Sequence, residues 1–249
     1  MSHVLKLVLA AVLAAAMHVP PSHARVPILM YHVIASAPAE APYPGLYVPP
    51  AEFSAEMNWL AAHHYHAVSL EQVFRAWHGS DVLPSRPVVL SFDDGYRSDY
   101  TAALPILRDR HWSGVLNMLV ANLKPVWGLR PGEVRKLMRA GWELDAHTLT
   151  HRDLTALAPP VAWREIDGSR LALRREFHVP VDFFCYPSGR WDTAVVEDVR
   201  RAGYEGATTE AFGLASPSQD PYVLDRVRVS GGEGAAGLAA SFAALGLPH

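Results

Sequence analysis

The sequence has a single cysteine, Cys185, and little net charge. One cysteine cannot form an intramolecular disulfide, so the fold must depend on its hydrophobic core. The formal net charge of −3 and the isoelectric point near 6.5 give no general attraction to nucleic acid or to an anionic membrane. There is also no internal repeat and no sign of a second domain. With 50% hydrophobic residues, 249 residues suffice for one sizeable core, which favours a single α/β domain.

The first 24 residues differ from the rest of the chain. Lys6 precedes an apolar run, 7–17, and residues 22–24 offer small side chains at a cleavage position. This pattern predicts a secretory signal peptide over 1–24 and a mature domain over 25–249, exported to the periplasm or secreted. The run is short for a helix that spans a bilayer, so we expect no stable membrane insertion after cleavage; a retained anchor is the alternative.

A short apolar segment, 88–90, leads to two adjacent carboxylates, Asp93 and Asp94, which Gly95 follows. The apolar, β-branched residues predict a buried strand. Burying two carboxylates at its end costs free energy unless a cation or several donors compensate their charge. The segment therefore favours a metal site, and a strand followed by an ordinary Asp-Gly turn is the alternative.

Two histidines, His147 and His151, follow a second strand-like segment, 142–146. Two imidazoles and one carboxylate are a typical ligand set for a catalytic zinc that keeps an open position for water. The same spacing occurs in zincin helices, but those have glutamate directly after the first histidine, where this chain has Thr148. Solvent-exposed histidines are the alternative for this pair alone, and the preceding pair of aspartates strengthens the metal interpretation.

Three motifs occur in a fixed order: SFDDGY at 91–96, HTLTH at 147–151 and FCYPSG at 184–189. Together they resemble the successive motifs of the polysaccharide deacetylase family, the NodB-homology carbohydrate esterases. The resemblance covers nearly all of the chain after residue 25, and three ordered motifs seldom arise by chance.

The resemblance implies roles for five residues. Asp93 would be the catalytic base, and the metal ligands would be Asp94, His147 and His151. The implied cofactor is a divalent metal; the imidazoles favour Zn²⁺, with Co²⁺ or Ni²⁺ as alternatives. The chain is most similar to the subgroup that acts on poly-N-acetylglucosamine, in which a histidine of an N-terminal YH motif is the general acid. That similarity implies His32, for which a core-facing position is the alternative.

The third motif departs from the common family pattern. Cys185 stands where arginine is usual, and Ser188 stands where an aromatic residue is common. The Pro-Ser-Gly turn can leave the main-chain N–H of Ser188 exposed to hold an oxyanion, with an ordinary turn as the alternative. The late histidine of the common pattern is absent from 224–229. There Arg226 can orient Asp93 through a charge-assisted pair, and a surface position is the alternative.

Two aromatic residues near this turn are candidate substrate-binding residues, Tyr186 and Trp191. Trp191, beside Asp192, can provide a platform on which a sugar ring stacks. A tryptophan at the start of a helix also serves packing, which is the alternative here.

Apolar segments alternate with amphipathic helical segments along the mature chain, which predicts a parallel sheet covered by helices. The family resemblance implies a distorted (β/α) barrel of about seven parallel strands in one domain. In such barrels the active site gathers at the C-terminal ends of the strands. The expected strands are 26–34, 66–70, 88–90, 114–120, 142–146, 181–186, 204–208 and 224–229. The expected helices are 51–64, 71–78, 98–111, 131–140, 160–177, 193–202 and 235–245.

The resemblance implies metal-dependent removal of acetyl groups from N-acetylglucosamine residues of a polysaccharide outside the cytoplasm. The partner would be an N-acetylated polysaccharide or oligosaccharide, and no nucleic acid. An O-acetyl glycan esterase with the same metal chemistry is one alternative, and a non-catalytic sugar-binding module is another. A glycosidase that uses Asp93 and Asp94 is disfavoured, because consecutive strand residues point to opposite faces.

Overall fold

The computed structural model describes residues 22–249. The signal peptide predicted for residues 1–24 lies mostly outside the described residues, since its first 21 residues are not among them. Within the described part of the chain, no helix has both the length and the apolar character that crossing a membrane requires.

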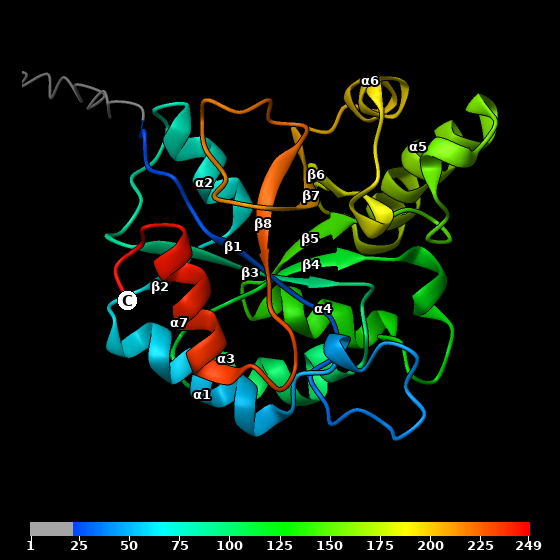
Figure 1. Ribbon diagram of the computed structural model, residues 1–249. Coiled ribbons are helices and arrows are strands. Elements are labelled where there is room, and N and C mark those ends of the chain that lie inside the picture. The colour runs from blue at the N-terminus through cyan, green and yellow to red at the C-terminus, as the bar shows by residue number, and fades with distance from the viewer. Residues whose placement is uncertain (1–21) are drawn as a thin grey trace, which may run out of the picture.

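Seven parallel strands form a closed barrel (Figure 1). The first of them, β1, pairs with both β3 and β8, and this double pairing closes the ring. The barrel is distorted, because β5 and β6 pair through one residue of each strand and β7 shifts its register against β8. The predicted fold class is therefore confirmed. The barrel strands are β1 (Ile28–Tyr31), β3 (Pro87–Asp93), β4 (Val115–Met118), β5 (Glu143–Ala146), β6 (Phe183–Cys185), β7 (Gly206–Phe212) and β8 (Leu224–Arg228). The two-residue strand β2 (His66–Ala67) pairs with the start of β3.

Helices cover the outside of the barrel (Figure 1). They are α1 (Pro50–Ala62), α2 (Leu70–Trp77), α3 (Leu104–Arg108), α4 (Pro131–Arg139), α5 (Pro159–Phe177), α6 (Thr193–Arg201) and α7 (Gly234–Ala244). Local sequence explains several starts: Ser69 and Gln72 form a capping box at α2, and the Asp192 carboxylate accepts a hydrogen bond from the Val195 N–H at α6.

The sequence predicts one helix over 98–111, and this prediction is wrong in detail. A π-helical turn, η2 (Asp99–Ala103), precedes the short helix α3. Pro105 lies in the first turn of α3 and has no N–H to donate to the turn before it, which accounts for the irregular start.

The barrel interior is apolar at one end and polar at the other. Side chains at the strand starts form a buried cluster that includes Ile28, Val89, Val115, Phe183 and Leu224. Helix α2 closes this end, since the Phe74 ring packs on the Phe183 ring with centroids 4.6 Å apart. Residues two positions further along a strand point the same way. Those residues are Met30, Ser91, Asn117, Cys185 and Arg226, so four of the five strands present polar side chains toward the open, C-terminal end.

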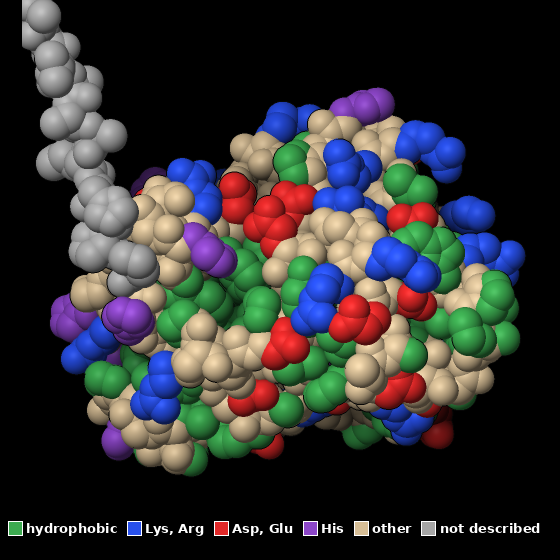
Figure 2. Space-filling model, turned by 90° about the horizontal axis from the view of Figure 1, so that it is seen from above, with side chains coloured by type: hydrophobic (Ala, Val, Ile, Leu, Met, Phe, Trp, Pro, Cys, Tyr) green, Lys and Arg blue, Asp and Glu red, His purple; other side chains and the backbone are tan. Residues whose placement is uncertain are grey.

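Basic side chains gather on the side of the molecule where α5 and α6 lie (Figure 2). On α6, Arg200 pairs with Glu197 at 2.6 Å and Arg201 pairs with Asp198 at 2.7 Å. These exposed pairs contribute little stability, but they offset part of the positive charge on this side. The expected lack of general affinity for nucleic acid stays a prediction.

Candidate active site

Three side chains converge beyond the C-terminal ends of β3 and β5. The Asp94 Oδ1 atom lies 3.5 Å from His147 Nε2 and 3.6 Å from His151 Nε2. This Oδ1 atom is buried and has no hydrogen-bond partner among the described residues. A buried carboxylate oxygen without a donor is costly unless a cation compensates it. One carboxylate and two imidazoles at these distances fit a divalent metal with a position left open.

His147 is oriented for this role by its other ring nitrogen. Its Nδ1–H donates a 2.7 Å hydrogen bond to the main-chain carbonyl of Cys185. This bond favours the tautomer with the proton on Nδ1, so the Nε2 lone pair is available to a metal ion beside Asp94.

The loop that carries both histidines is held in a conformation uncommon for residues with a side chain. Thr148 and His151 have φ of 67° and 60°, in the left-handed region. The Thr148 hydroxyl accepts a 2.9 Å hydrogen bond from the His151 N–H. The buried carboxylate of Glu165, on α5, accepts bonds of 3.0 and 2.8 Å from the N–H groups of Leu149 and Thr150. The Thr150 hydroxyl donates a third bond to Glu165, at 2.7 Å, so one carboxylate fixes the middle of the loop.

Asp93 lies beside this group in a dense hydrogen-bond network. Arg226 donates to both of its oxygens, Nη1 to Oδ1 and Nη2 to Oδ2, each at 2.8 Å. Asn117 Nδ2 donates to Oδ1 at 2.7 Å, and the Cys185 thiol lies 3.6 Å from Oδ2. Burial alone would raise the pKa of Asp93, but the Arg226 guanidinium holds that pKa well below its usual range. Three hydrogen bonds therefore fix the Asp93 carboxylate in position, and the guanidinium favours its ionised form.

Arg226 lies against Asp93, which is one of the two positions that the sequence left open. The other, a position on the surface, is wrong for this residue. Only 1% of Arg226 is exposed. Its Nε atom donates to the Thr209 carbonyl at 2.7 Å, so the guanidinium is fixed on the side away from Asp93 as well. Arg228, two residues on, is partly exposed and pairs with Glu210 at 2.5 Å.

A second group, Asp93, His147 and Cys185, also brings possible ligand atoms together. It is the poorer metal site for two reasons. Donors from Arg226 and Asn117 already occupy the Asp93 carboxylate. Burial raises the pKa of the Cys185 thiol, which favours its neutral form, and a thiol binds metal as the thiolate.

His32 follows β1 and faces the same cavity. Its Nε2 atom lies 3.9 Å from Asp93 Oδ2, and burial lowers its pKa. The cavity has a volume of about 470 Å³, within the usual range for ligand sites. It is lined by His32, Tyr43, Leu46, Asp93, Asp94, His147, His151, Ser188, Glu210 and Arg228. The structure thus brings together the predicted residues of all three motifs with His32.

Ser188 reaches this cavity through a strained turn. Its φ is 53° and that of Gly189 is 63°. A Cβ atom at Gly189 would lie 2.6 Å from the Glu210 main-chain nitrogen, so only glycine fits there. This close packing against β7 fixes the backbone that carries the Ser188 N–H.

Tyr186 and Trp191 do not join the other candidates. Tyr186 is fully buried, and its hydroxyl donates to the Tyr222 carbonyl at 2.9 Å, so its predicted contact with substrate is wrong. Trp191 is exposed but does not line the cavity. Its neighbour Asp192, expected beside a sugar platform, instead caps α6.

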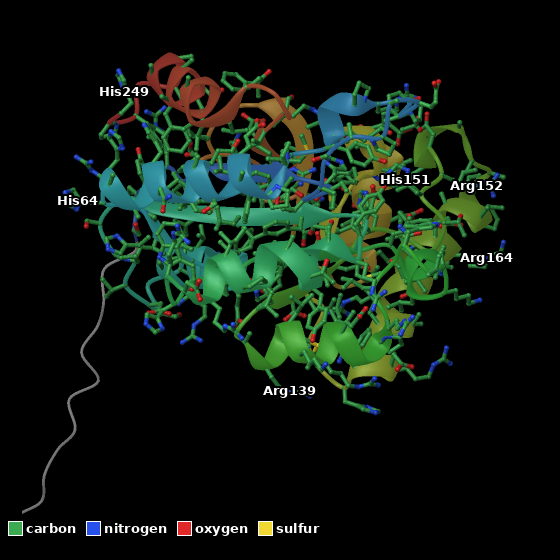
Figure 3. The ribbon with its side chains drawn as sticks, turned by 90° about the horizontal axis from the view of Figure 1, so that it is seen from below. His64, Arg139, His151, Arg152, Arg164 and His249 are labelled. Atoms are coloured by element: carbon green, nitrogen blue, oxygen red, sulfur yellow. The ribbon has the colours of Figure 1, made fainter. Side chains whose placement is uncertain are left out.

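Sequence reasoning missed Asn117 and Glu165. Asn117 follows the alternation of its strand into the barrel, a signal available from the sequence. Glu165 occupies a buried position among apolar residues of α5, which is unusual for glutamate and was the available sign. A further histidine group, 63–66, is separate from the site, since His64 lies at the opposite end of the molecule from His151 (Figure 3).

Comparisons with known proteins identify the family to which this chain is similar. Residues 81–207 match the family model described as polysaccharide deacetylase. The Bacillus subtilis protein YxkH, named for the same family, is 30% identical over 209 residues, 84% of this chain and 73% of that protein. The poly-β-1,6-N-acetyl-D-glucosamine N-deacetylase of Escherichia coli is 27% identical over a match covering 66% of this chain. That match spans only 31% of the E. coli protein.

Solved structures show the same fold. The deacetylase PplD of Streptococcus pyogenes, determined in complex with acetate, superposes with a TM-score of 0.81 at 26% identity. The superposition covers 88% of this chain and 99% of PplD. IcaB from Ammonifex degensii has a TM-score of 0.75 at 19% identity, over 89% of this chain and 97% of IcaB, and supports the fold alone.

Proposed function

We propose, from the premise that this chain belongs to the polysaccharide deacetylase family, that it is a metal-dependent N-deacetylase of a polysaccharide outside the cytoplasm. Its substrate would be N-acetylglucosamine residues of that polysaccharide. The observation that carries the proposal is the single cavity in which Asp94, His147 and His151 meet Asp93 and His32. The name of the E. coli relative supports the choice of acetylated sugar.

The residues that would hold the cofactor are Asp94, His147 and His151. A divalent metal, Zn²⁺ in the first instance, would polarise the amide carbonyl and acidify a water molecule. The ionised Asp93 would accept the proton that this water loses as it attacks the carbonyl carbon. The bidentate pair with Arg226 supports this role, since it fixes both carboxylate oxygens in direction.

Two further groups would complete the reaction. The Ser188 main-chain N–H, on a turn that packs closely against β7, would donate to the oxyanion. His32 would protonate the leaving amine, because an amine leaves poorly as its anion. Its position supports this role, since the imidazole lines the cavity with Nε2 3.9 Å from Asp93 Oδ2.

The exported location rests on the signal peptide proposed for residues 1–24. The N-terminal residue of the protein recovered from outside the cytoplasm would test it: a start at Arg25 supports cleavage, and a start at Met1 contradicts it.

Acetate release from β-1,6-linked N-acetylglucosamine oligomers tests the proposal. We expect chelation to abolish release and added Zn²⁺ or Co²⁺ to restore it. Asp93→Asn should lower kcat by roughly 10²–10⁴-fold. His32→Ala should lower it strongly without changing the metal content. His64→Ala, an exposed histidine at the far end of the molecule (Figure 3), is the matched control.

Two results would contradict the proposal. Release that persists in Asp93→Asn or after chelation would exclude this mechanism. Release from O-acetylated glycans alone would identify an ester substrate in place of the amide.

A further inference from the structure

A second hollow lies beside the catalytic cavity. Its volume is about 390 Å³, and it is lined by Val33, Tyr47, Tyr96, Ser98 and Trp127. No charged side chain is among these lining residues, whereas the catalytic cavity is lined largely by ionisable groups. A ligand that fits here is neutral and has both apolar and hydroxyl-bearing surface.

The two hollows share their walls. His32 and Leu46 line the catalytic cavity. The residues that follow them in the chain, Val33 and Tyr47, line the other hollow. The segments 32–33 and 46–47 are joined, since the Val33 N–H donates to the Leu46 carbonyl at 3.1 Å and the Val48 N–H to the Val33 carbonyl at 2.8 Å. In the segment 94–96, Asp94 lines the catalytic cavity and Tyr96 lines the other hollow. A ligand that extends beyond the catalytic cavity therefore meets this hollow next.

The aromatic surface of the hollow is partly open to solvent. Trp127 is 50% exposed, and its ring centroid lies 5.5 Å from that of Tyr96, with the planes tilted by 36°. An exposed tryptophan face supported by a second ring is a platform for the apolar C–H face of a flat ligand. The hydroxyls of Tyr47, Tyr96 and Ser98 are groups that can bond the polar edge of such a ligand.

The loop that carries Trp127 is fixed to the metal-ligand segment. The Arg97 N–H donates to the Trp127 carbonyl at 2.8 Å. Gly128 packs so closely on Asn122 that a Cβ atom there would lie 1.9 Å from the Asn122 carbonyl oxygen. The Asn122 side chain in turn donates to the Asp94 carbonyl at 3.0 Å. The platform therefore has a fixed position relative to Asp94, as a specific binding site needs.

We propose that this hollow is a sugar subsite, in which a neighbouring pyranose ring of the glycan stacks on Trp127 while another residue of the chain is deacetylated. The inference rests on the proposed function, because it takes a glycan as the substrate. A pyranose combines an apolar C–H face with a rim of hydroxyls and carries no charge, which matches the lining. The subsite makes the protein selective for chains over single sugars.

Trp127→Ala tests the subsite through chain length. In the unmodified protein, kcat/KM should rise from N-acetylglucosamine to its oligomers. Trp127→Ala should lower kcat/KM for oligomers by roughly three- to tenfold and leave hydrolysis of a small aryl acetate unchanged. Trp127→Phe, which keeps an aromatic face, should recover most of the loss. Leu171→Ala removes a similarly exposed apolar side chain from α5 and is the control.

A binding measurement separates this inference from the proposed function. Calorimetric titration of Asp93→Asn with oligomers should show affinity that falls when Trp127→Ala is added. That result would support the subsite even if acetate release failed. Oligomer binding or turnover that is the same with and without Trp127 would overturn it. Equal losses on oligomers and on the aryl acetate would overturn it too, as would binding of lipid vesicles, but not oligomers, through Trp127.

Discussion

Replacing Arg226 by methionine should lower the free energy of unfolding by about 3–5 kcal/mol, the usual cost of breaking a buried ion pair from one side. The contacts explain the size. The replacement removes two charge-assisted hydrogen bonds of 2.8 Å to Asp93, each worth roughly 1.5–3 kcal/mol. It also leaves the Asp93 carboxylate in a site from which water is excluded, with Asn117 as its remaining amide donor.

Urea unfolding followed by tryptophan fluorescence measures this loss. With a denaturant slope of about 3 kcal/mol per molar, the midpoint should fall by roughly 1–1.5 M. Arg228→Met is the matched control. That arginine lies two residues along the same strand but forms a partly exposed pair with Glu210, so we expect a loss of about 0–1 kcal/mol.

The double variant Asp93→Asn with Arg226→Met isolates the pair. The double variant removes both charges and leaves neither one buried alone. Its loss in free energy of unfolding should therefore be smaller than the sum of the two single losses, by about 2 kcal/mol or more. Additive losses would refute the reasoning, and so would a loss in Arg226→Met no larger than that in Arg228→Met. Either result would mean that Asp93 does not depend on Arg226 for its charge.

Two other substitutions test the supporting structure. Glu165→Gln should weaken Zn²⁺ binding by about 10–100-fold in a competition titration, since an amide cannot accept all three loop hydrogen bonds; unchanged affinity would contradict the inferred support. Burial raises the pKa of Glu56 from 4.5 to about 7, so the unfolded chain loses this proton first and stability falls as pH rises from about 4.5 to 7. Glu56→Gln should remove that slope and add about 1–3 kcal/mol at pH 8 in urea unfolding, whereas an unchanged slope would exclude Glu56 as its source.

Much of the fold was predictable because its signals are local. The strand before Asp93 begins with the apolar run 87–90, and the segment 142–146 before His147 alternates apolar with acidic residues. Both follow helices with recognisable boundaries, so the alternation is visible without tertiary information. The motif spacing then placed Asp93, Asp94 and His147 at strand ends, where the structure has them.

The parts that sequence reasoning missed depend on contacts between distant segments. Nothing near Glu165 in the sequence says that its carboxylate meets a loop 15 residues earlier. The error at Tyr186 has a different cause. Alternation along β6 directs Phe183 and Cys185 into the barrel and the residues between and after them outward, so Tyr186 belongs to the outer core. That alternation is visible in the sequence 183–186.

The double pairing of β1 has a consequence for how the molecule folds. Leu29 pairs with Val227, near the two ends of the described chain, so the ring closes only when the last strand meets the first. Contacts of such long sequence separation form late and make folding slow. Arg226 reaches Asp93 only through that closure. A chain still emerging from the ribosome, or one that lacks 224–249, therefore keeps an open edge on β1 and leaves Asp93 without its Arg226 partner. The Asp93–Arg226 pair forms only once the whole domain has been synthesised and the ring has closed.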